Sequence, residues 1–364
     1  MLLTKINYRE FPDNEKNNYW ELKDLVLGQS NLIVGKNATG KTRTVNLASG
    51  LAQIINSQKL NNGEFEVEFN TDDNKKFVYE LKQIDGKAIY EKIIFDGVVK
   101  LTRNDGKTNI ASIKGNREIE PPEDKLVLHV RRDKKEHPFL EYLYEWAANT
   151  VGYRFGKSDP SLIAIPGDNK GLLQSLDTVP SIFEKLSQES IKQVIKDFNN
   201  VGYELEEVAL GVVGGKPFDA KLLHLKEKGI KFPIIQVNIS SGMFRAFALL
   251  VAIQYIVDMV PNHTGTVLVD DFGEGLDYER ASRLAKVVFE KMGKNKIQFI
   301  TTTNDRFLMN AVDIEKWNIL IRENEKVKAL NYTNSKKRFD EFKLTGLNNF
   351  DLFSSDYLTN YKSE

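Results

Sequence analysis

The sequence predicts an α/β fold with a mixed, largely parallel core sheet, and two observations support this prediction. A motif of the form G-x-x-x-x-G-K-T occupies residues 35–42, directly after an apolar run at 31–34 and before a helix-like stretch at 42–58. Farther along, buried strands alternate with helical segments between residues 230 and 332. Because crossover helices join parallel strands, this alternation around a glycine-rich loop indicates an α/β sandwich.

The glycine-rich motif has the strand–loop–helix context of a phosphate-binding loop. Gly35 and Gly40 permit positive φ angles and a close approach of the backbone, so that successive N–H groups curl around an anion. We expect Lys41 to reach the β- and γ-phosphates as a point charge, and the Thr42 hydroxyl to be a ligand of Mg²⁺. A chance match in a glycine-rich turn is the alternative, and the flanking strand and helix argue against it.

The composition excludes several classes of function. A length of 364 residues suits two or three domains. The chain has no cysteine, which excludes disulfides, thiolate metal sites and cysteine nucleophiles. The 51 basic and 51 acidic residues balance, which argues against a globally cationic nucleic-acid binder.

We expect a cytoplasmic protein with no membrane-spanning segment. Residues 1–6 alternate like a strand and lack the apolar core and cleavage site of a secretion signal. The most apolar stretch, 247–257, is too short to cross a bilayer and is followed by Asp258, so it predicts a buried helix.

Period-two segments after the phosphate-loop helix predict an antiparallel meander. Earlier strands are expected at 2–11 and 25–28, with a polar turn at 12–18 between them. Asp85-Gly86 is a tight-hairpin signal inside the meander, which we expect to form an arm beside the nucleotide site. Its predicted strands are 65–69, 77–81 and 88–94.

From residue 131 the pattern becomes mainly helical. Helices are predicted at 138–150 and 181–198, with a loop-like segment at 156–171 between them. The second helix follows Pro180 and opens with a capping box of Ser181 and Glu184. No sustained heptad repeat is present, which excludes a long coiled-coil arm.

The C-terminal part alternates strands and helices and carries two acidic residues at a strand end. In an open α/β sheet the strand ends converge beside the phosphate loop, so Asp270 suits the Mg²⁺ side and Asp271 suits a water-polarising role. A simple turn is the alternative interpretation of this pair. Predicted strands are 230–239, 266–269 and 297–301, predicted helices are 247–257, 278–292 and 304–312, and a hairpin is expected at 317–332.

Five motifs in this order resemble the ATPase heads of the ABC superfamily, most closely the soluble branch that contains the SMC, RecF and OLD-type proteins. The pattern at 6–11 before the loop strand is similar to that branch as well. The resemblance covers roughly residues 1–130 and 230–332, and it implies ATP and Mg²⁺ as ligands. The motifs are 35–42, Ser240-Ser241-Gly242, 267–271, Gly275-Leu276-Asp277 and 301–305.

The resemblance also implies a domain organisation. Residues 1–130 would be the N-terminal half of the ATPase head with its β meander, and 131–229 a mainly helical insertion acting as a lid. Residues 230–333 would be the C-terminal half of the head, and 334–364 a C-terminal helical tail.

Individual roles follow by position from the same resemblance. Ser240 and Gly242 match the signature motif, which in that family contacts the γ-phosphate of a nucleotide bound to a second protomer, and Asp277 matches a loop residue that crosses the dimer interface. A helix cap is the alternative role at both places. The expected nucleotide contacts are Gly35, Lys36, Asn37, Ala38, Thr39, Gly40, Lys41, Thr42, Arg43, Ser240, Ser241, Gly242 and Asp277; the expected metal ligands are Thr42 and Asp270; the expected catalytic residues are Lys41, Asp271 and Thr303.

Two departures from the family pattern affect the expected rate. Family members usually carry Glu at the position of Asp271 and His at the position of Thr303. A shorter carboxylate must hold its water from farther back, and a Thr hydroxyl cannot carry charge. We therefore predict tight ATP binding with slow hydrolysis.

Some expected features have no clear place in the sequence. The Gln that usually lines the Mg²⁺ site is not identified, and Gln53 and Gln83 are candidates only by residue type. For an aromatic platform under adenine the candidates are Tyr8, Tyr19 and Trp20, each of which also suits simple packing.

Two functions from different classes fit these observations. The first is an ATP-gated, dimerising ATPase that acts on DNA or on a separate nuclease or toxin partner in bacterial defence or genome maintenance. The second is a scaffold without turnover, in which ATP clamps two subunits and the insertion binds a protein partner. A transporter nucleotide subunit fits less well because the coupling Gln is missing and the meander is long.

Overall fold

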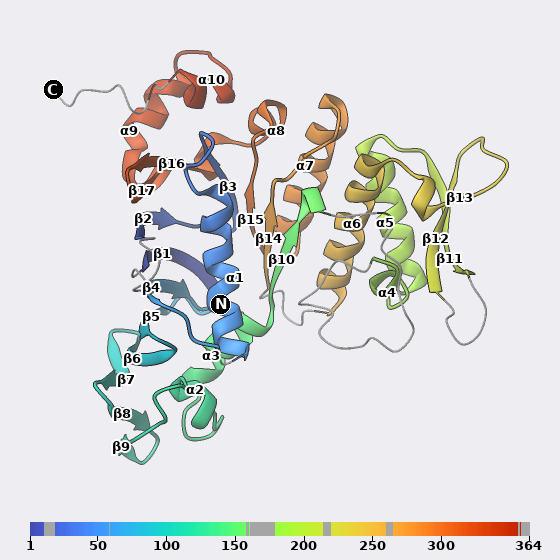
Figure 1. Cartoon of the computed structure of the whole chain (residues 1–364). Coiled ribbons are helices and arrows are strands. Elements are labelled where there is room, and N and C mark those ends of the chain that lie inside the picture. Colours follow the sequence, from blue (N-terminus) through green and yellow to red (C-terminus); the bar gives the residue numbers. More distant parts are fainter. Residues whose placement is uncertain are drawn as a thin grey trace. The chain divides into compact units, whose positions relative to one another are not determined.

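The computed structural model divides into two compact units (Figure 1). Unit 1 comprises Met1–Thr150, Ile314–Leu347 and Asp356–Glu364, and unit 2 comprises Val151–Asp313 and Asn348–Ser355. The four segments expected from the sequence divide the chain differently and remain a prediction about domain organisation. The structure describes residues 1–10, 19–57, 59–157, 160, 179–213, 220–259, 265–355 and 357.

Unit 1 is built on a mixed sheet in which the phosphate-loop strand pairs in parallel. Strand β3 (Ser30–Gly35) lies parallel to β16 (Trp317–Glu323), and β17 (Lys326–Asn331) lies parallel to β2 (Trp20–Val26). β16 and β17 form the expected hairpin. Within unit 1 the strand order is β3-β16-β17-β2-β1-β4-β5-β6-β7-β8-β9, where β1 is Leu2–Glu10.

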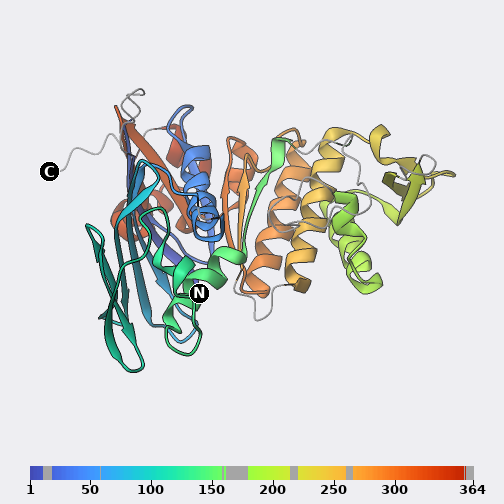
Figure 2. The same ribbon diagram turned by 60° about the horizontal axis from the view of Figure 1, so that its bottom comes forward.

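The meander is confirmed and is longer than the sequence pattern predicted. Asp-Gly pairs connect three successive hairpins with positive φ at both residues, which is the geometry of two-residue turns that match the strand twist. Only the first, Asp85-Gly86, was recognised in the sequence, whereas Asp96-Gly97 and Asp105-Gly106 close the others. The strands are β4 (Gly63–Asn70), β5 (Lys76–Ile84), β6 (Lys87–Phe95), β7 (Val98–Asn104), β8 (Lys107–Ser112) and β9 (Gly115–Ile119), and they follow one another in Figures 1 and 2.

Helices cover the loop strand and the meander of unit 1. Helix α1 (Lys41–Ser57) begins inside the glycine-rich motif, and the Asn56 amide donates to the Ala147 carbonyl of α3 (Phe139–Ala148) at 2.9 Å. Trp146 of α3 packs edge-on against Phe69 of β4, with ring centroids 4.9 Å apart. This unit also contains α2 (Val127–Val130) and α9 (Tyr332–Lys343).

Unit 2 places parallel strands beside a layer of helices. Strands β14 (Thr266–Asp270) and β15 (Gln298–Thr302) are fully buried and parallel. Helices α5 (Gln188–Val201), α6 (Ser241–Met259) and α7 (Tyr278–Lys294) lie side by side in both views (Figures 1 and 2). The unit also contains α4 (Val179–Phe183), α8 (Arg306–Ala311), α10 (Asn349–Ser354) and β10, which starts at Thr150 and runs to Arg154.

Helix α6 is the apolar core of unit 2. By length and composition alone it is apolar enough to cross a membrane, but 72% of its most apolar window is buried inside the structure. The prediction of a buried helix is therefore confirmed, although the helix is longer than the predicted stretch. A polar cluster ties it to its neighbours, because the Lys291 ammonium of α7 contacts Asp197 of α5 and Gln254 of α6, each at 2.5 Å.

Two predicted elements of unit 2 were wrong. The single helix at 181–198 is two helices, because Ser187 starts a new one by accepting a hydrogen bond from the Ser190 N–H. The predicted strand at 230–239 is reduced to β13 (Ile234–Ile235), which pairs with β12 (Ala220–Glu227) and is followed by a 3₁₀ turn. β12 also pairs with β11 (Leu205–Val213), and neither of these strands was predicted.

Some predictions fall on residues outside the described part of the chain. These are the polar turn at 12–18 with Phe11 before it, the end of the first helix at Gln58, and most of the loop-like segment at 156–171.

Candidate functional site

The phosphate loop of unit 1 has a backbone that only small residues allow. A Cβ on Gly35 would lie 2.4 Å from the Thr39 hydroxyl oxygen, so a side chain cannot fit there. Gly40 has a φ of +100°, and a Cβ there would lie 3.2 Å from the Trp20 ring. Ala38 at the tip also has a positive φ, of 63°. The loop is therefore tightly curled, as a phosphate cradle requires.

The Lys41 ammonium is held against the loop itself. Lys41 is 7% exposed, and its Nζ donates to the Gly35 carbonyl at 2.7 Å and to the Lys36 carbonyl at 3.3 Å. The cation is thus held at the backbone of the loop, and its expected contact with phosphate stays a prediction. Thr42, next in the chain, is exposed at the first turn of α1.

Arg43 and Trp20 form one packed pair beside the loop. The Arg43 guanidinium lies 4.5 Å from the centroid of the Trp20 ring, and it pairs with Glu10. Burial lowers the pKa of Arg43 from its usual value, and nearby Arg322 adds to this effect. Trp20 is 2% exposed and lies close to Gly40 as well, so it packs the loop in this structure rather than offering a free ring face.

The other aromatic candidates differ in burial. Tyr8 is half-buried and packs on Phe65 with ring centroids 4.7 Å apart, and burial raises its pKa. Tyr19 is also half-buried. A role for either under a base stays a prediction.

Arg322 is a loop contact that sequence reasoning missed. It lies on β16, and its guanidinium donates to the Ala38 carbonyl at the loop tip at 2.8 Å and to the Asn324 carbonyl at 2.7 Å. The contact joins residues 284 positions apart. Only the parallel pairing of β16 with β3 brings them together, and no local pattern signals it.

In unit 2, Thr302 organises the acidic strand end. Its hydroxyl donates to Asp270 Oδ1 at 2.7 Å and accepts the Asp271 N–H at 2.9 Å. Asp270 is buried at the end of β14, and Thr302 ends the neighbouring strand β15. One hydroxyl therefore fixes both residues of the acidic pair, and sequence reasoning did not single it out.

The backbone conformation at residue 271 suits an aspartate. Its φ is +54°, in the left-handed region that Asp and Asn enter more readily than longer residues. The turn continues with a hydrogen bond from the Glu274 N–H to the Asp271 carbonyl. The short carboxylate thus matches the local conformation.

Thr303 has a structural role in this molecule. It is fully buried, its hydroxyl donates to the Phe272 carbonyl at 2.9 Å, and it accepts the Asp305 N–H at 3.1 Å. The hydroxyl proton of Thr303 is therefore already bonded to the Phe272 carbonyl. Its expected contact with a phosphate stays a prediction.

The Ser240-Ser241-Gly242 motif begins helix α6 and is locked to a neighbouring loop. The exposed Ser240 accepts the Met243 N–H at 3.3 Å, which is a helix cap. A Cβ on Gly242 would lie 2.8 Å from the Gly275 carbonyl oxygen. Arg245, one turn on, donates to the carbonyls of Glu274 at 3.1 Å and Gly156 at 2.8 Å.

Asp277 is the N-cap of α7, as its alternative interpretation predicted. Its carboxylate accepts the Arg280 N–H at 3.0 Å and pairs with the Arg280 guanidinium at 2.9 Å. The pKa of Asp277 is lowered, chiefly by the hydrogen bond from the backbone N–H of Arg280. The charge of the Arg280 guanidinium lowers it further. The side chain is exposed, so the cap leaves it accessible.

The candidate residues for a Gln near the metal differ in structure. Gln83 is buried and accepts the Asn61 N–H at 2.9 Å, whereas Gln53 is exposed on α1. Among the described residues no group of three His, Asp or Glu could hold a metal ion by itself. Thr42 and Asp270 as ligands of Mg²⁺ stay a prediction.

A curled phosphate loop before a helix, together with an acid-ended buried strand in an α/β fold, defines a P-loop NTPase. The chain belongs to the family described as AAA domain, putative AbiEii toxin, Type IV TA system, whose model matches residues 30–310. The predicted P-loop class is confirmed, and membership of this family implies nucleotide binding. A comparison with curated protein sequences gave no match.

The fold is similar to that of SMC heads. A structure described as the SmcHead bound to the C-winged helix domain of ScpA matches with a TM-score of 0.50 at 13% identity, over 93% of this chain and 100% of that chain. The SMC head domain from Thermotoga maritima gives 0.49 at 13% identity, over 91% and 99%. The structure of cbiO1 from Clostridium perfringens, part of the ABC transporter complex cbiONQ, gives 0.40 at 15% identity, over 98% and 96%.

Proposed function

We propose that the chain binds ATP with Mg²⁺ at loop 35–42 and hydrolyses it slowly. The observation that carries this proposal is the geometry of the loop. A Cβ on Gly35 would clash with the Thr39 hydroxyl, Gly40 has a positive φ, and the Lys41 ammonium is held at the Gly35 carbonyl. Closely approaching N–H groups beside a fixed cation at a helix N-terminus are suited to a polyphosphate.

Each expected group has a definite task in this proposal. The loop N–H groups donate to phosphate oxygens, and Lys41 neutralises their charge. Thr42 and Asp270 are the protein ligands for Mg²⁺, which when bound neutralises charge on the β- and γ-phosphate oxygens. Asp271 orients the attacking water and accepts its proton.

Two features of unit 2 support slow turnover. Asp271 is held in a left-handed backbone conformation with a short side chain, so its carboxylate reaches less far than a glutamate would. The Thr303 hydroxyl donates its proton to the Phe272 carbonyl, so this proton is not available to a phosphate oxygen. Slow hydrolysis gives the ATP-bound state a long lifetime.

We also propose that two copies close around the nucleotide and that the ATP-bound form controls a separate effector, with DNA as a further target. The exposed Ser240 and Asp277 support the dimer, because a second copy can reach both side chains. The family name, which refers to a putative toxin, supports a setting in bacterial defence. The SmcHead structure bound to a winged helix domain supports a protein partner.

A scaffold that binds ATP without turnover is the second candidate function. The committed hydroxyl of Thr303 and the short Asp271 favour it. The two functions differ in one measurement, since only the ATPase needs ATP consumption to release its partner.

Lys41→Ala tests nucleotide binding directly. Hydrogen bonds to charged groups contribute about 1.5–3 kcal/mol, so the variant should bind ATP–Mg²⁺ at least about tenfold more weakly in isothermal titration calorimetry. Lys59→Ala removes an exposed lysine beyond the end of α1 and should bind like the wild type. Equal affinity of the wild type and Lys41→Ala would contradict the proposal.

A further inference from the structure

The tip of the phosphate loop is held from outside its own motif. The Arg322 guanidinium donates through Nη1 to the Ala38 carbonyl at 2.8 Å and through Nε to the Asn324 carbonyl at 2.7 Å. Asn324 lies in the two-residue turn that joins β16 to β17. One planar guanidinium therefore bridges this hairpin turn and the loop tip, both of which belong to unit 1.

The register of the sheet places Arg322 beside the loop. Leu320 of β16 lies opposite Gly35, and a Cβ on Gly35 would be 3.3 Å from the Leu320 Cβ. Alternate side chains of a strand point to the same face, so Arg322, two residues after Leu320, stands on the face that adjoins the loop. The bond to Asn324 then orients the guanidinium, and Nη1 meets the Ala38 carbonyl.

The loop tip has a backbone that benefits from such a contact. Ala38 has a φ of +63°, a left-handed conformation that is unfavourable for a residue with a side chain and that persists where its surroundings hold it. Carbonyls earlier in the motif accept hydrogen bonds from Lys41 and Thr39, which belong to the motif itself. The Ala38 carbonyl is held by Arg322 instead. Because the C=O and N–H of one peptide unit point in opposite directions, a held carbonyl also fixes the direction of the next N–H.

The charge of Arg322 is a separate feature of the same contact. Both acceptors are carbonyls, so these bonds do not neutralise the guanidinium. Burial lowers the pKa of Arg43, and the charge of Arg322 lowers it further. Holding the loop and attracting an anion are therefore two distinct effects. Salt screens the attraction by an exposed side chain, but it does not screen a hydrogen bond within the protein.

We propose that Arg322 is a positioning residue of the phosphate site. By holding the Ala38 carbonyl, Arg322 keeps the loop tip curled before a ligand arrives, so that a polyphosphate does not have to order the loop when it binds. Arg322 acts through the loop and not by contact with the nucleoside. This inference rests on the proposed binding of ATP at loop 35–42.

Isothermal titration calorimetry of the full chain compares the wild type with Arg322→Ala. We expect ATP–Mg²⁺ to bind about fivefold or more weakly to the variant, because binding must then order the loop. Inorganic triphosphate with Mg²⁺ should lose affinity by the same factor, since it meets the same loop. The factor should also be the same at about 50 mM and about 500 mM salt, because the proposed effect is not electrostatic attraction.

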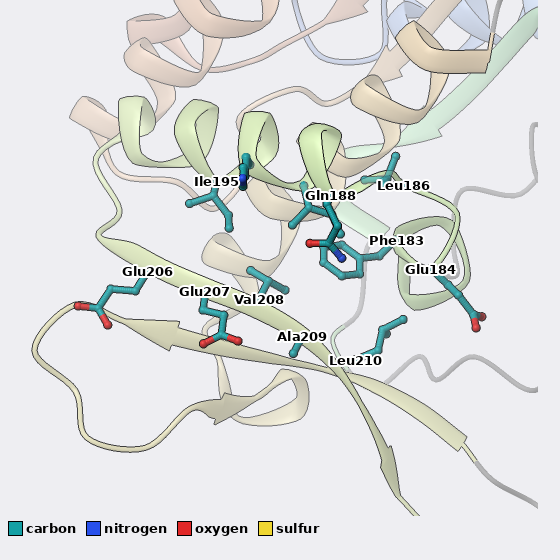
Figure 3. Close-up of a pocket in the computed structure, with 12 residues that line it drawn as sticks. Phe183, Glu184, Leu186, Gln188, Ile195, Glu206, Glu207, Val208, Ala209 and Leu210 are labelled. Carbon is teal, nitrogen blue, oxygen red and sulfur yellow. The ribbon is translucent and has the colours of Figure 1, made fainter.

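Two exposed lysines supply the control variants. Lys326→Ala removes a cation from the same hairpin, at the start of β17. Lys192→Ala removes a cation from α5 in unit 2, where this residue lines a groove beside β11 (Figure 3). Each control should bind ATP–Mg²⁺ like the wild type.

Hydrogen–deuterium exchange of the nucleotide-free chain measures the hold on the loop directly. Amides in the peptide that spans residues 35–42 should exchange faster in Arg322→Ala than in the wild type. Amides of β4 and β5 should exchange equally in both proteins, which also shows that the variant is folded. The measurement needs no ligand, so it still tests the role of Arg322 if the wild type fails to bind ATP and the proposed function is wrong.

Several results would overturn the inference. Equal exchange of the loop in the two nucleotide-free proteins, or equal affinity of the two proteins for ATP–Mg²⁺, would show that Arg322 does not position the loop. A loss of affinity for ATP that inorganic triphosphate does not share would mean that the guanidinium contacts the nucleoside. A loss that disappears at high salt would mean that Arg322 acts by its charge alone.

Discussion

Residue 271 shows how backbone conformation selects a side chain at a site. A φ of +54° favours Asp or Asn, and the Thr302 hydroxyl holds the residue by its N–H. From the sequence, Asp271 is a departure from the glutamate that the family usually carries, and the sequence alone offers no reason for the change. In the structure, Asp271 stands at a positive φ that suits an aspartate, in a turn that the Glu274 N–H closes on the Asp271 carbonyl.

Asp271→Asn should remove the proposed base and leave the fold unchanged, because Asn tolerates the same φ. Losing a general base costs about a hundredfold or more in rate, so kcat for ATP hydrolysis should fall by that factor while the affinity for ATP stays within about threefold. Phosphate release and calorimetry measure the two quantities. Glu274→Gln, which changes an exposed carboxylate three residues away, should keep the wild-type rate.

If Asp271→Asn hydrolyses ATP as fast as the wild type, the carboxylate has no part in the reaction. The scaffold function would gain support if neither protein hydrolyses ATP but both bind it.

Several site residues were predictable because their signal is local. The residues of loop 35–42 and the pair Asp270-Asp271 at the end of β14 follow from spacing and from the adjacent apolar strands. Arg322 and Thr302 were missed because each acts through a neighbouring strand that is distant in sequence. A register between non-consecutive strands cannot be derived from one strand's own pattern.

At the scale of elements, Gly242 joins helix α6 to the loop before α7. Its missing side chain lets the Gly275 carbonyl approach, and Arg245 donates to the Glu274 carbonyl of the same loop. The loop ends in Asp277, the cap of α7. The start of α6 and the start of α7 are therefore joined through this loop within unit 2.

Gly242→Ala should strain this connection. The new Cβ would lie 2.8 Å from a backbone oxygen, and overpacking of this kind costs about 1–3 kcal/mol in the free energy of unfolding. Urea denaturation measures the loss. Gly293→Ala on α7 has no atom within 4 Å of the added Cβ and serves as the matched control, with no loss expected. Equal unfolding free energies of the two variants would contradict the close packing.

Helix α2 depends on a neutral histidine. His129 Nδ1 accepts the Leu126 N–H at 3.2 Å, and Nε2 lies 2.8 Å from the Ile55 carbonyl oxygen, to which it can donate. Burial lowers the pKa of His129 below its usual 6.5. Between that lowered pKa and 6.5 the unfolded chain binds more protons than the folded one, so stability falls as the pH drops through this window.

The comparison of wild type with His129→Asn isolates this contribution. We expect the unfolding free energy of the wild type to decrease between pH 7.5 and pH 5 by more than that of the variant, as measured by urea denaturation at each pH. Parallel pH profiles for the two proteins would show that folding does not lower the pKa of His129.

Long, regular elements were predicted well, and short or interrupted ones were not. The meander and the alternating strands and helices after residue 266 carry strong periodicity and turn signals. The break between α4 and α5 was missed because Ser187 competes as a cap inside a continuous helical pattern. β11 and β12 were missed because the segment around them was taken as helical.

At the scale of the whole molecule, the expected site residues are distributed over both units. Lys41 and Thr42 belong to unit 1, whereas Asp270, Asp271 and Ser240 belong to unit 2. The proposed function therefore requires the full chain, and every variant is best tested in it. In the proposed dimer, Ser240 of a second copy would lie at the nucleotide. The proposal therefore requires that two copies assemble when ATP is bound.

Light scattering after size exclusion tests the central claim most directly, with the Asp271→Asn chain as the sample so that ATP persists. The account predicts a mass of 41.5 kDa without nucleotide and twice that mass with ATP–Mg²⁺, and no change for a chain that also carries Lys41→Ala. A mass that stays at 41.5 kDa while calorimetry shows ATP bound to the same sample would contradict it.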